Sequence, residues 1–166
     1  AFLPEFDSVR FSDGLALTNA TNARLLYLVP DFANPTGQTL SKQDRVAALE
    51  LARRAGAILV EDAAYTDLRY EGDAEPRIAA LDVAQSGSIE ASRTFYCGTF
   101  SKTLSPGLRV GWVCGPASLI RRLTLIKQAS DLHTSTINQQ VIFRIASDYF
   151  DQAVARARET YVQRRD

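Results

Sequence analysis

Two short, uninterrupted runs of apolar residues, Leu25–Val29 and Ala57–Val60, constrain the fold of this chain more than any other feature of its sequence. Each is typical of a strand that is buried on both faces, as in a parallel sheet. Between them, Ser41 and Asp44 have the spacing of a helix-capping box, and Gly56 is placed to end the helix. This β-loop-α-β unit predicts a right-handed crossover between two parallel strands.

Two further strands and three helices complete the predicted secondary structure. Strands are expected at Arg93–Cys97 and Arg109–Cys114, and only a loop fits between them, so they should be antiparallel neighbours. Helices are expected at about residues 117–129 and 136–147, with another from about residue 150 onward. The chain is therefore predicted to have an α/β fold, in which a mostly parallel sheet is flanked by helices.

The composition narrows the classes of function. The chain has 166 residues, 46% of them hydrophobic and 23% charged, and its formal net charge is zero. This mixture is typical of one globular domain and gives no sign of a surface for nucleic acid or for membranes. No apolar run is long enough to cross a bilayer, so we expect neither a membrane nor a nucleic-acid partner for this segment. The lack of methionine indicates a piece of a larger protein.

The few cysteine, histidine and paired acidic residues do not indicate a metal site. Cys97 and Cys114 lack CxxC spacing and are expected to be buried, structural thiols of a cytosolic protein. His133 is the only histidine and is expected to be structural rather than a catalytic base, and no metal is predicted. Glu61 and Asp62 are adjacent on a strand, so they should point to opposite faces and not share a site.

Three groups of polar residues stand after the first three predicted strands. Asn34 follows the first strand, Asp62 and Tyr65 follow the second, and the segment Thr99–Lys102 follows the third. In open α/β sheets, ligands bind in the crevice outside the carboxyl ends of the strands. We therefore expect the three groups to converge on one crevice.

Lys102 and its surroundings indicate a ligand that is both an aldehyde and a phosphate. Lysine is the side chain that usually forms imines with carbonyl compounds, because a desolvated ammonium loses its proton readily. The hydroxyls of Thr99 and Ser101 and the guanidinium of Arg109 suit a phosphate group. Pyridoxal 5'-phosphate combines the two groups and is the predicted cofactor.

The same cofactor explains the remaining polar residues. Its pyridine nitrogen needs a carboxylate in order to stay protonated, and Asp62 is placed to provide one. Its phenolic oxygen needs hydrogen-bond donors, which Asn34 and Tyr65 can supply. Taken singly, each residue has a simpler explanation: a strand-exit cap for Asp62, core packing for Tyr65, an Asx turn for Asn34. Only their convergence with Lys102 favours a cofactor site.

These residues lie in motifs that resemble those of the fold-type I pyridoxal-phosphate aminotransferases, class I/II. The order and spacing agree over roughly residues 25 to 150. The segment Asp131-Leu132-His133-Thr134, followed by Asn138-Gln139, is similar to the branch that contains the 2-aminoadipate and kynurenine aminotransferases. The matching motifs are Asn34-Pro35-Thr36-Gly37, Asp62-Ala63-Ala64-Tyr65, Ser101-Lys102 and Pro106-Gly107-Leu108-Arg109-Val110-Gly111-Trp112.

The resemblance implies a role for each candidate residue. Lys102 would form the internal aldimine and then move the proton between the substrate Cα and the cofactor. Asp62 would pair with the pyridine nitrogen, while Asn34 and Tyr65 would hold the phenolic oxygen. A cis peptide bond is expected between Asn34 and Pro35. The phosphate would be held by Thr99, where serine is more usual, and by Ser101 and Arg109.

The resemblance also implies how the chain is organised. Residues 1–148 would form part of the cofactor-binding large domain, and residues 149–166 would begin the helix that leads to a missing small domain. The full-length protein would be a cytoplasmic homodimer that transfers the amino group of an amino acid to a 2-oxo acid. The segment alone is expected to bind the cofactor weakly and to turn over poorly.

Three alternatives stay open at this point. The chain is also similar to the aminotransferase-like effector domains of certain bacterial transcription regulators. A lyase of the same fold would use the same cofactor for β-elimination. An unrelated doubly wound nucleotide-binding module would share the fold class without the cofactor.

Overall fold

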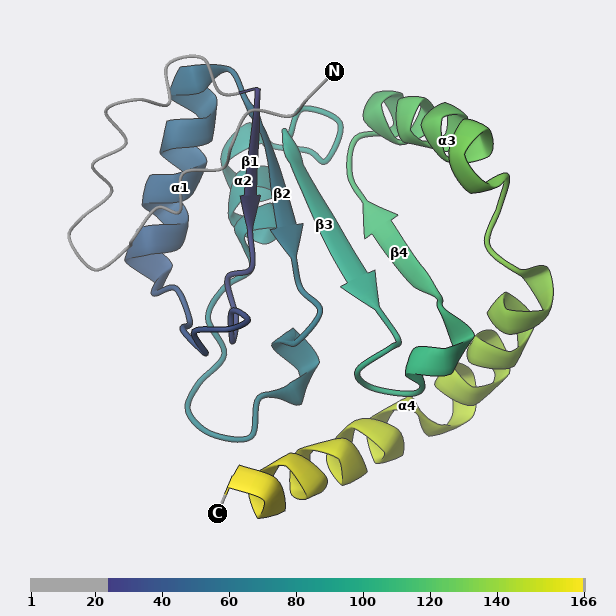
Figure 1. Ribbon diagram of the computed structural model, residues 1–166. Helices are drawn as coiled ribbons and strands as arrows, with labels where there is room; N and C mark the ends of the chain where they lie inside the picture. Colours follow the sequence, from purple (N-terminus) through teal and green to yellow (C-terminus); the bar gives the residue numbers. More distant parts are fainter. Residues whose placement is uncertain (1–23, 166) are drawn as a thin grey trace.

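The computed structural model describes residues 24–165, so the start of the predicted large domain lies outside the described residues. Ten elements alternate along this part of the chain (Figure 1). The strands are β1 (Leu25–Leu28), β2 (Ile58–Asp62), β3 (Thr94–Thr99) and β4 (Gly111–Cys114). The helices are α1 (Lys42–Ala55), α2 (Ile78–Ser86), α3 (Ala117–Asp131) and α4 (Thr136–Arg165), with short 3₁₀ turns η3 (Thr66–Leu68) and η4 (Pro106–Leu108).

The described strands form one sheet in the order β1-β2-β3-β4. β1, β2 and β3 are parallel, and β4 is antiparallel to β3, as the sequence predicts. The register pairs Tyr27 with Val60, and Asp62 with Cys97. Because β1 to β3 run in the same direction, their carboxyl ends lie at one edge of the sheet, the lower edge in Figure 1.

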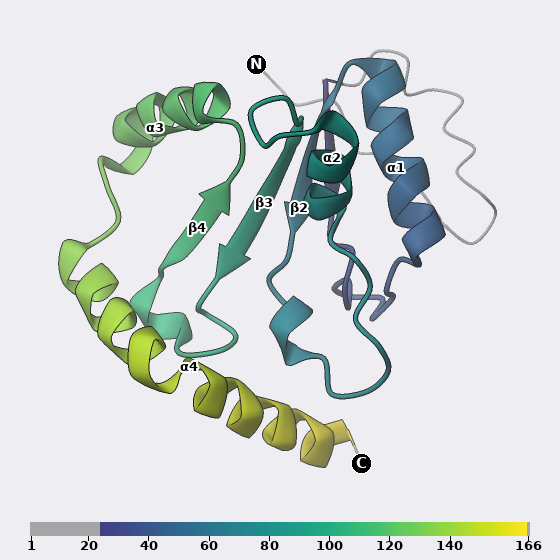
Figure 2. The same ribbon diagram turned by 180° about the vertical axis from the view of Figure 1, so that it is seen from behind.

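The hydrophobic core lies between the sheet and the two helices α1 and α2, which Figure 2 shows on the near side of β2. Leu28 and Leu59 face these helices and are buried. Leu25 and Tyr27 face the other way and are 45% and 46% exposed. The prediction that the first strand is buried on both faces is therefore wrong for the described residues, because no described helix covers that second face. The core is made by Leu28, Leu40, Ala48, Leu49, Ala52, Leu59 and Ile78.

Helix α1 has the ends that the sequence predicts. The hydroxyl of Ser41 accepts a hydrogen bond from the Asp44 backbone N–H at 3.2 Å, and the Asp44 carboxylate accepts one from the Ser41 N–H at 3.3 Å. This reciprocal capping box satisfies two N–H groups at the helix start. Gly56 ends the helix in the left-handed conformation, with φ 64°, which glycine adopts without a steric cost.

Helix α4 differs from the sequence prediction. The predicted helices at 136–147 and from 150 onward form one helix, since no glycine or proline interrupts residues 136–165. The predicted domain boundary at residue 148 lies inside this helix, and the division into domains stays a prediction. The later part of α4 passes beneath the carboxyl edge of the sheet (Figure 1), where Arg158 Nε donates to the Asp67 carbonyl at 2.9 Å.

None of the described helices is both long enough and apolar enough to cross a lipid bilayer.

Candidate active site

Asp62 lies at the carboxyl end of β2, on the sheet face that points away from α1 and α2. The hydroxyl of Tyr27, on β1, donates to Asp62 Oδ2, and the Ala64 backbone N–H donates to Oδ1 at 3.2 Å. Cys97 stands opposite Asp62 on β3. Burial raises the pKa of the Cys97 thiol, and the nearby charges of Asp62 and Glu61 raise it further, so the thiol stays neutral beside the carboxylate.

Glu61 lies on the opposite face from Asp62, as predicted. Its side chain is buried and accepts hydrogen bonds from the backbone N–H groups of Ile78 at 3.0 Å and Ala79 at 2.8 Å. These groups open helix α2, where a carboxylate is electrostatically favourable. Burial raises the pKa of Glu61, and the two hydrogen bonds oppose that rise. Glu61 therefore stabilises the helix start and does not share the site with Asp62.

Lys102 and Tyr65 meet at the carboxyl edge although they follow different strands. Lys102 is exposed in the loop that joins β3 to β4, and its Nζ lies 5.4 Å from the centre of the Tyr65 ring. Tyr65 is half-buried just before η3, in the loop that leaves β2. The Lys102 amine therefore lies beside the Tyr65 phenol, and Asp62, three residues before Tyr65, ends β2.

The three residues predicted to hold a phosphate lie at the end of β3 and in the loop that joins it to β4. The Thr99 hydroxyl donates to the Val110 carbonyl at 3.3 Å and accepts from the Ser101 N–H at 3.1 Å, which closes the base of the loop. Arg109 is exposed, and its Nη1 donates to the Pro106 carbonyl at 3.4 Å. Contrary to prediction, Arg109 precedes β4 rather than beginning it, because its left-handed backbone, with φ 51°, cannot continue a strand.

Asn34 lies in the exposed loop after β1, and the predicted cis peptide bond between Asn34 and Pro35 is confirmed. The start of this loop is held by Asp31, which is 3% exposed. Asp31 thereby ties the loop after β1 to α1 and to the loop after β2, in which Tyr65 lies. The side chains that donate to Asp31 are Arg45 and Arg69, each at 2.8 Å, and Thr66 at 3.1 Å.

The structure corrects one of the cysteine predictions. Both cysteines are free, but only Cys97 is half-buried, and Cys114 is exposed. Cys114 was expected to be buried, yet every residue of β4 is exposed among the described residues, since β4 lies at the edge of the sheet. His133 lies between α3 and α4, where its Nδ1 is 2.8 Å from the Thr134 carbonyl oxygen, in keeping with a structural role.

Sequence reasoning missed two side chains of this region, Tyr27 and Asp31. Tyr27 was interpreted only as one of several apolar strand residues. Its neighbour in the sheet is Val60, two residues before Asp62, but that register is not readable from the sequence. Asp31 could have been found, because a carboxylate directly after a buried strand needs partners and Arg45 and Arg69 are available.

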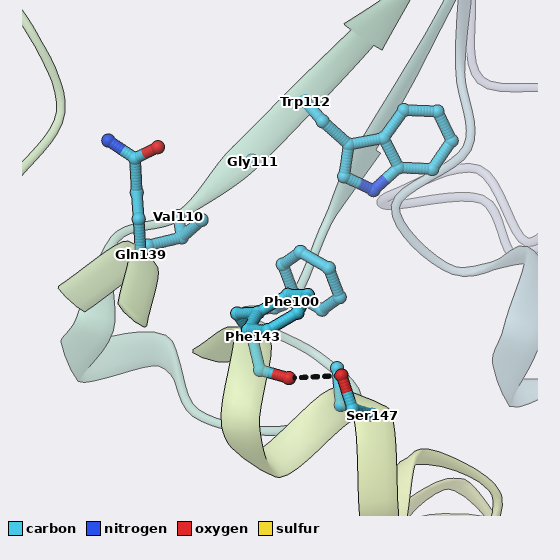
Figure 3. A pocket seen from close by; sticks show the side chains of 8 residues that line it. Phe100, Val110, Gly111, Trp112, Gln139, Phe143 and Ser147 are labelled. Atoms are coloured by element: carbon cyan, nitrogen blue, oxygen red, sulfur yellow. Dashed lines mark hydrogen bonds between the residues drawn. The ribbon is translucent and has the colours of Figure 1, made fainter. Parts of the chain in front are cut away.

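One open cavity of about 440 Å³ lies beside the candidate site, between β4 and the first half of α4 (Figure 3). Figure 3 shows Trp112, Phe100 and Phe143 facing this space, and the Ser147 hydroxyl donates to the Phe143 carbonyl at 2.7 Å. It reaches the Lys102 loop through Phe100 and Val110, and none of the predicted site residues lines it.

The donor set at this edge fits pyridoxal phosphate. The Lys102 amine can meet an aldehyde, and the hydroxyls and guanidinium of the same loop can meet a phosphate. The Asp62 carboxylate is held by two donors, one on each oxygen, so it presents a fixed acceptor for a protonated ring nitrogen.

The chain is similar to known proteins over most of its length. Aromatic-amino-acid aminotransferase 1 of Thermococcus litoralis is 38% identical over 86% of this chain and 33% of that protein. The uncharacterized HTH-type transcriptional regulator YisV of Bacillus subtilis is 36% identical over 86% of this chain and 28% of its own length. The crystal structure of Pyrococcus horikoshii kynurenine aminotransferase in complex with PMP superposes with a TM-score of 0.78, at 40% identity, over 86% of this chain and 34% of that one.

This chain spans about a third of the length of these relatives. Residues 15–166 match the sequence profile of the family described as Aminotransferase class I and II. The superposition on the kynurenine aminotransferase structure agrees with that match. On these grounds the chain belongs to the class I and II aminotransferases.

Proposed function

We propose that this chain is the cofactor-binding core of a pyridoxal-phosphate-dependent aminotransferase, which transfers the amino group of an amino acid to a 2-oxo acid. The observation that supports it most strongly is the approach of the Lys102 amine to the Tyr65 ring at the carboxyl edge of the sheet, where Asp62 ends β2. Family membership supports the same reading.

Each residue is given a task in this proposal. Asp62 accepts a hydrogen bond from the ring nitrogen, and Asn34 and Tyr65 donate to the phenolic oxygen. When bound, pyridoxal phosphate supplies an electron sink for the electron pair left at the substrate Cα. The Nζ of Lys102 would accept the proton from that carbon and later return it. The phosphate is assigned to Thr99, Ser101 and Arg109.

The small number of lysines makes the assignment of Lys102 specific. The only other lysines in the sequence are Lys42 and Lys127. Lys42 is exposed at the first turn of α1, and Lys127 is paired with Asp131 on the surface of α3, with Nζ 2.8 Å from the carboxylate. Of the three lysines, only Lys102 lies against the ring of a predicted site residue, Tyr65.

The proposal is tested by turnover of the full-length protein with a 2-oxo acid acceptor. The amino acid donors are aromatic amino acids, kynurenine and 2-aminoadipate, and both products are measured. We expect a new 2-oxo acid and a new amino acid in equal amounts, loss of both in Lys102→Ala, and retention in the control Lys127→Ala. Release of ammonia with a 2-oxo acid would instead indicate a lyase.

The similarity to a transcription regulator keeps a second function in view. A regulator would use the same edge of the sheet to bind the cofactor, but its activity would be the control of DNA binding. In that case the full-length protein would retain pyridoxal phosphate and show no amino transfer with any donor. A DNA-binding segment in the full-length sequence would support this alternative.

We further propose that the full-length protein works as a homodimer in the cytoplasm. The free thiols of Cys97 and Cys114 suit a reducing compartment. Helices α3 and α4 expose large apolar side chains, which a second copy or the rest of the polypeptide would cover. Sedimentation of the full-length protein should give twice the monomer mass, and a monomer would contradict the dimer. The most exposed of these side chains are Leu125, Ile126, Ile137 and Phe143.

A further inference from the structure

We propose that Tyr27 is a positioning residue for Asp62, whose hydroxyl fixes the carboxylate in the orientation that receives the pyridine nitrogen. The inference rests on the proposed function, because it assumes that Asp62 meets the ring of pyridoxal phosphate. It adds a residue from β1 to a site whose other members come from the ends of β2 and β3 and from the loops that follow the strands.

The sheet places Tyr27 and Asp62 on the same face. Tyr27 stands opposite Val60 in the parallel register, and Asp62 follows Val60 by two residues. Side chains two apart on a strand share a face, so the Tyr27 ring lies on the Asp62 side of the sheet. The adjacent residues Leu28 and Glu61 are buried on the side of α1 and α2. The length of a tyrosine side chain then lets its hydroxyl reach past Val60 to Asp62.

The two donors leave the Asp62 carboxylate little freedom to rotate. Tyr27 donates to Oδ2, and the Ala64 N–H donates to Oδ1 at 3.2 Å. Each carboxylate oxygen can accept more than one hydrogen bond, so an acceptor position stays available for a ring N–H. A residue held in this way is already oriented for its ligand and loses less conformational entropy on binding.

The phenol of Tyr27 is suited to be a permanent donor. Burial raises its pKa above the ordinary value, and the hydrogen bond to Asp62 and the charge of that carboxylate raise it further. The phenol therefore keeps its proton over the physiological pH range and places no second negative charge beside the carboxylate. Among the described residues, Cys97 and Tyr65 are the other titratable groups near it, and both are neutral when protonated.

The test compares Tyr27→Phe with the wild type in the full-length protein. The substitution keeps the ring and removes only the hydroxyl. Because Asp62 would lose one of the two donors that orient it, we expect the Kd for pyridoxal phosphate to rise roughly tenfold. The absorption maximum of the bound cofactor and its pH dependence should also shift, since the electronic state of the ring depends on Asp62. Tyr149→Phe, which removes a hydroxyl on the exposed side of α4, is the control and should change neither.

A double-mutant cycle shows whether Tyr27 acts through Asp62. In an Asp62→Ala background, Tyr27→Phe should no longer change the Kd for pyridoxal phosphate, because the group that it orients is gone. The proposal would be overturned if Tyr27→Phe raised the Kd tenfold in both the wild-type and the Asp62→Ala backgrounds. It would also be overturned if the single variant Tyr27→Phe had the Kd and the absorption spectrum of the wild type. The proposal would also be overturned if the cofactor-free Tyr27→Phe protein had a lowered melting temperature and this loss of stability explained the whole loss of affinity.

The failure of this inference can be distinguished from failure of the proposed function. If the wild-type protein itself binds no pyridoxal phosphate, the proposed function is wrong, and the role of Tyr27 fails with it. If the wild type binds the cofactor and Asp62→Ala weakens that binding while Tyr27→Phe does not, the proposed function stands and only the role of Tyr27 is refuted.

Discussion

Replacing Asp31 by alanine tests whether a buried ionic cluster holds the two loops that contain Asn34 and Tyr65. The Arg45 side chain is fully buried, and its Nη2 lies 2.8 Å from Asp31 Oδ1. Arg69 approaches the same oxygen at 2.8 Å and is 15% exposed. Without the carboxylate, Arg45 would keep hydrogen bonds to backbone carbonyls but would be a buried charge with no carboxylate in contact, and only the charge of Glu61 would remain nearby.

The expected loss of stability follows from that geometry. Removing one partner of a buried ion pair costs about 3–5 kcal/mol, because the remaining charge is left uncompensated. Arg69 adds little to this figure, since its more exposed guanidinium can turn toward water. We therefore expect Asp31→Ala to lower the free energy of unfolding by about 4 kcal/mol, a large share of the 5–15 kcal/mol that is usual for a domain.

The measurement is urea unfolding of the cofactor-free, full-length protein, followed by titration with pyridoxal phosphate. The matched control is Asp131→Ala, which removes an exposed ion pair to Lys127 and should cost no more than about 1 kcal/mol. The double variant Asp31→Ala/Arg45→Met should be less destabilised than Asp31→Ala alone, because it removes the buried charge. An Asp31→Ala protein that is as stable as the control, or that binds pyridoxal phosphate as the wild type does, would refute the reasoning.

Two further perturbations test the sheet and the packing of α2. Gly98→Ala should lower the melting temperature by several degrees, because an added Cβ would collide with the Trp112 indole on β4, while Gly107→Ala, whose new Cβ would meet only Ser105 Oγ at 3.8 Å, should not. Asp82 should make the stability of the protein depend on pH. Burial raises the pKa of Asp82, but hydrogen bonds from the Arg93 N–H and other donors outweigh the effect of burial, so the pKa lies below the ordinary 3.8. Ionised Asp82 therefore stabilises the folded protein fully above the ordinary pKa of 3.8, and this stabilisation is lost as the pH falls through the lowered pKa of the folded state. In Asp82→Asn, the urea midpoint should therefore change less with pH below about 4 than it does in the wild type.

Much of the fold could be predicted because it follows from local signals. Apolar runs separated by a capped helix predict parallel strands, and the short loop between β3 and β4 leaves room only for an antiparallel pair. The predictions of a break near residue 148 and of a first strand buried on both faces were wrong for physical reasons. A helix without glycine or proline continues through residue 148, and a strand of apolar residues can still leave one face exposed, as Leu25 and Tyr27 do.

The candidate site was predictable only in part. Asn34, Asp62 and Lys102 could be placed at one edge from strand order alone, since the carboxyl ends of parallel strands coincide. The contact between Tyr27 and Asp62 depends on the register of β1 against β2, and that register depends on how α1 packs rather than on any local pattern. The cluster around Asp31 depends in the same way on tertiary packing.

The role of Lys102 is tested most directly by covalent labelling. The full-length protein is mixed with pyridoxal phosphate, reduced with borohydride, digested and mapped by mass spectrometry, with Lys102→Ala treated in parallel. We predict a phosphopyridoxyl adduct on the peptide that contains Lys102, none on Lys42 or Lys127, and none anywhere in this chain in the variant. An adduct on either of the other two lysines in place of Lys102, or an unlabelled wild-type chain, would contradict the proposed site.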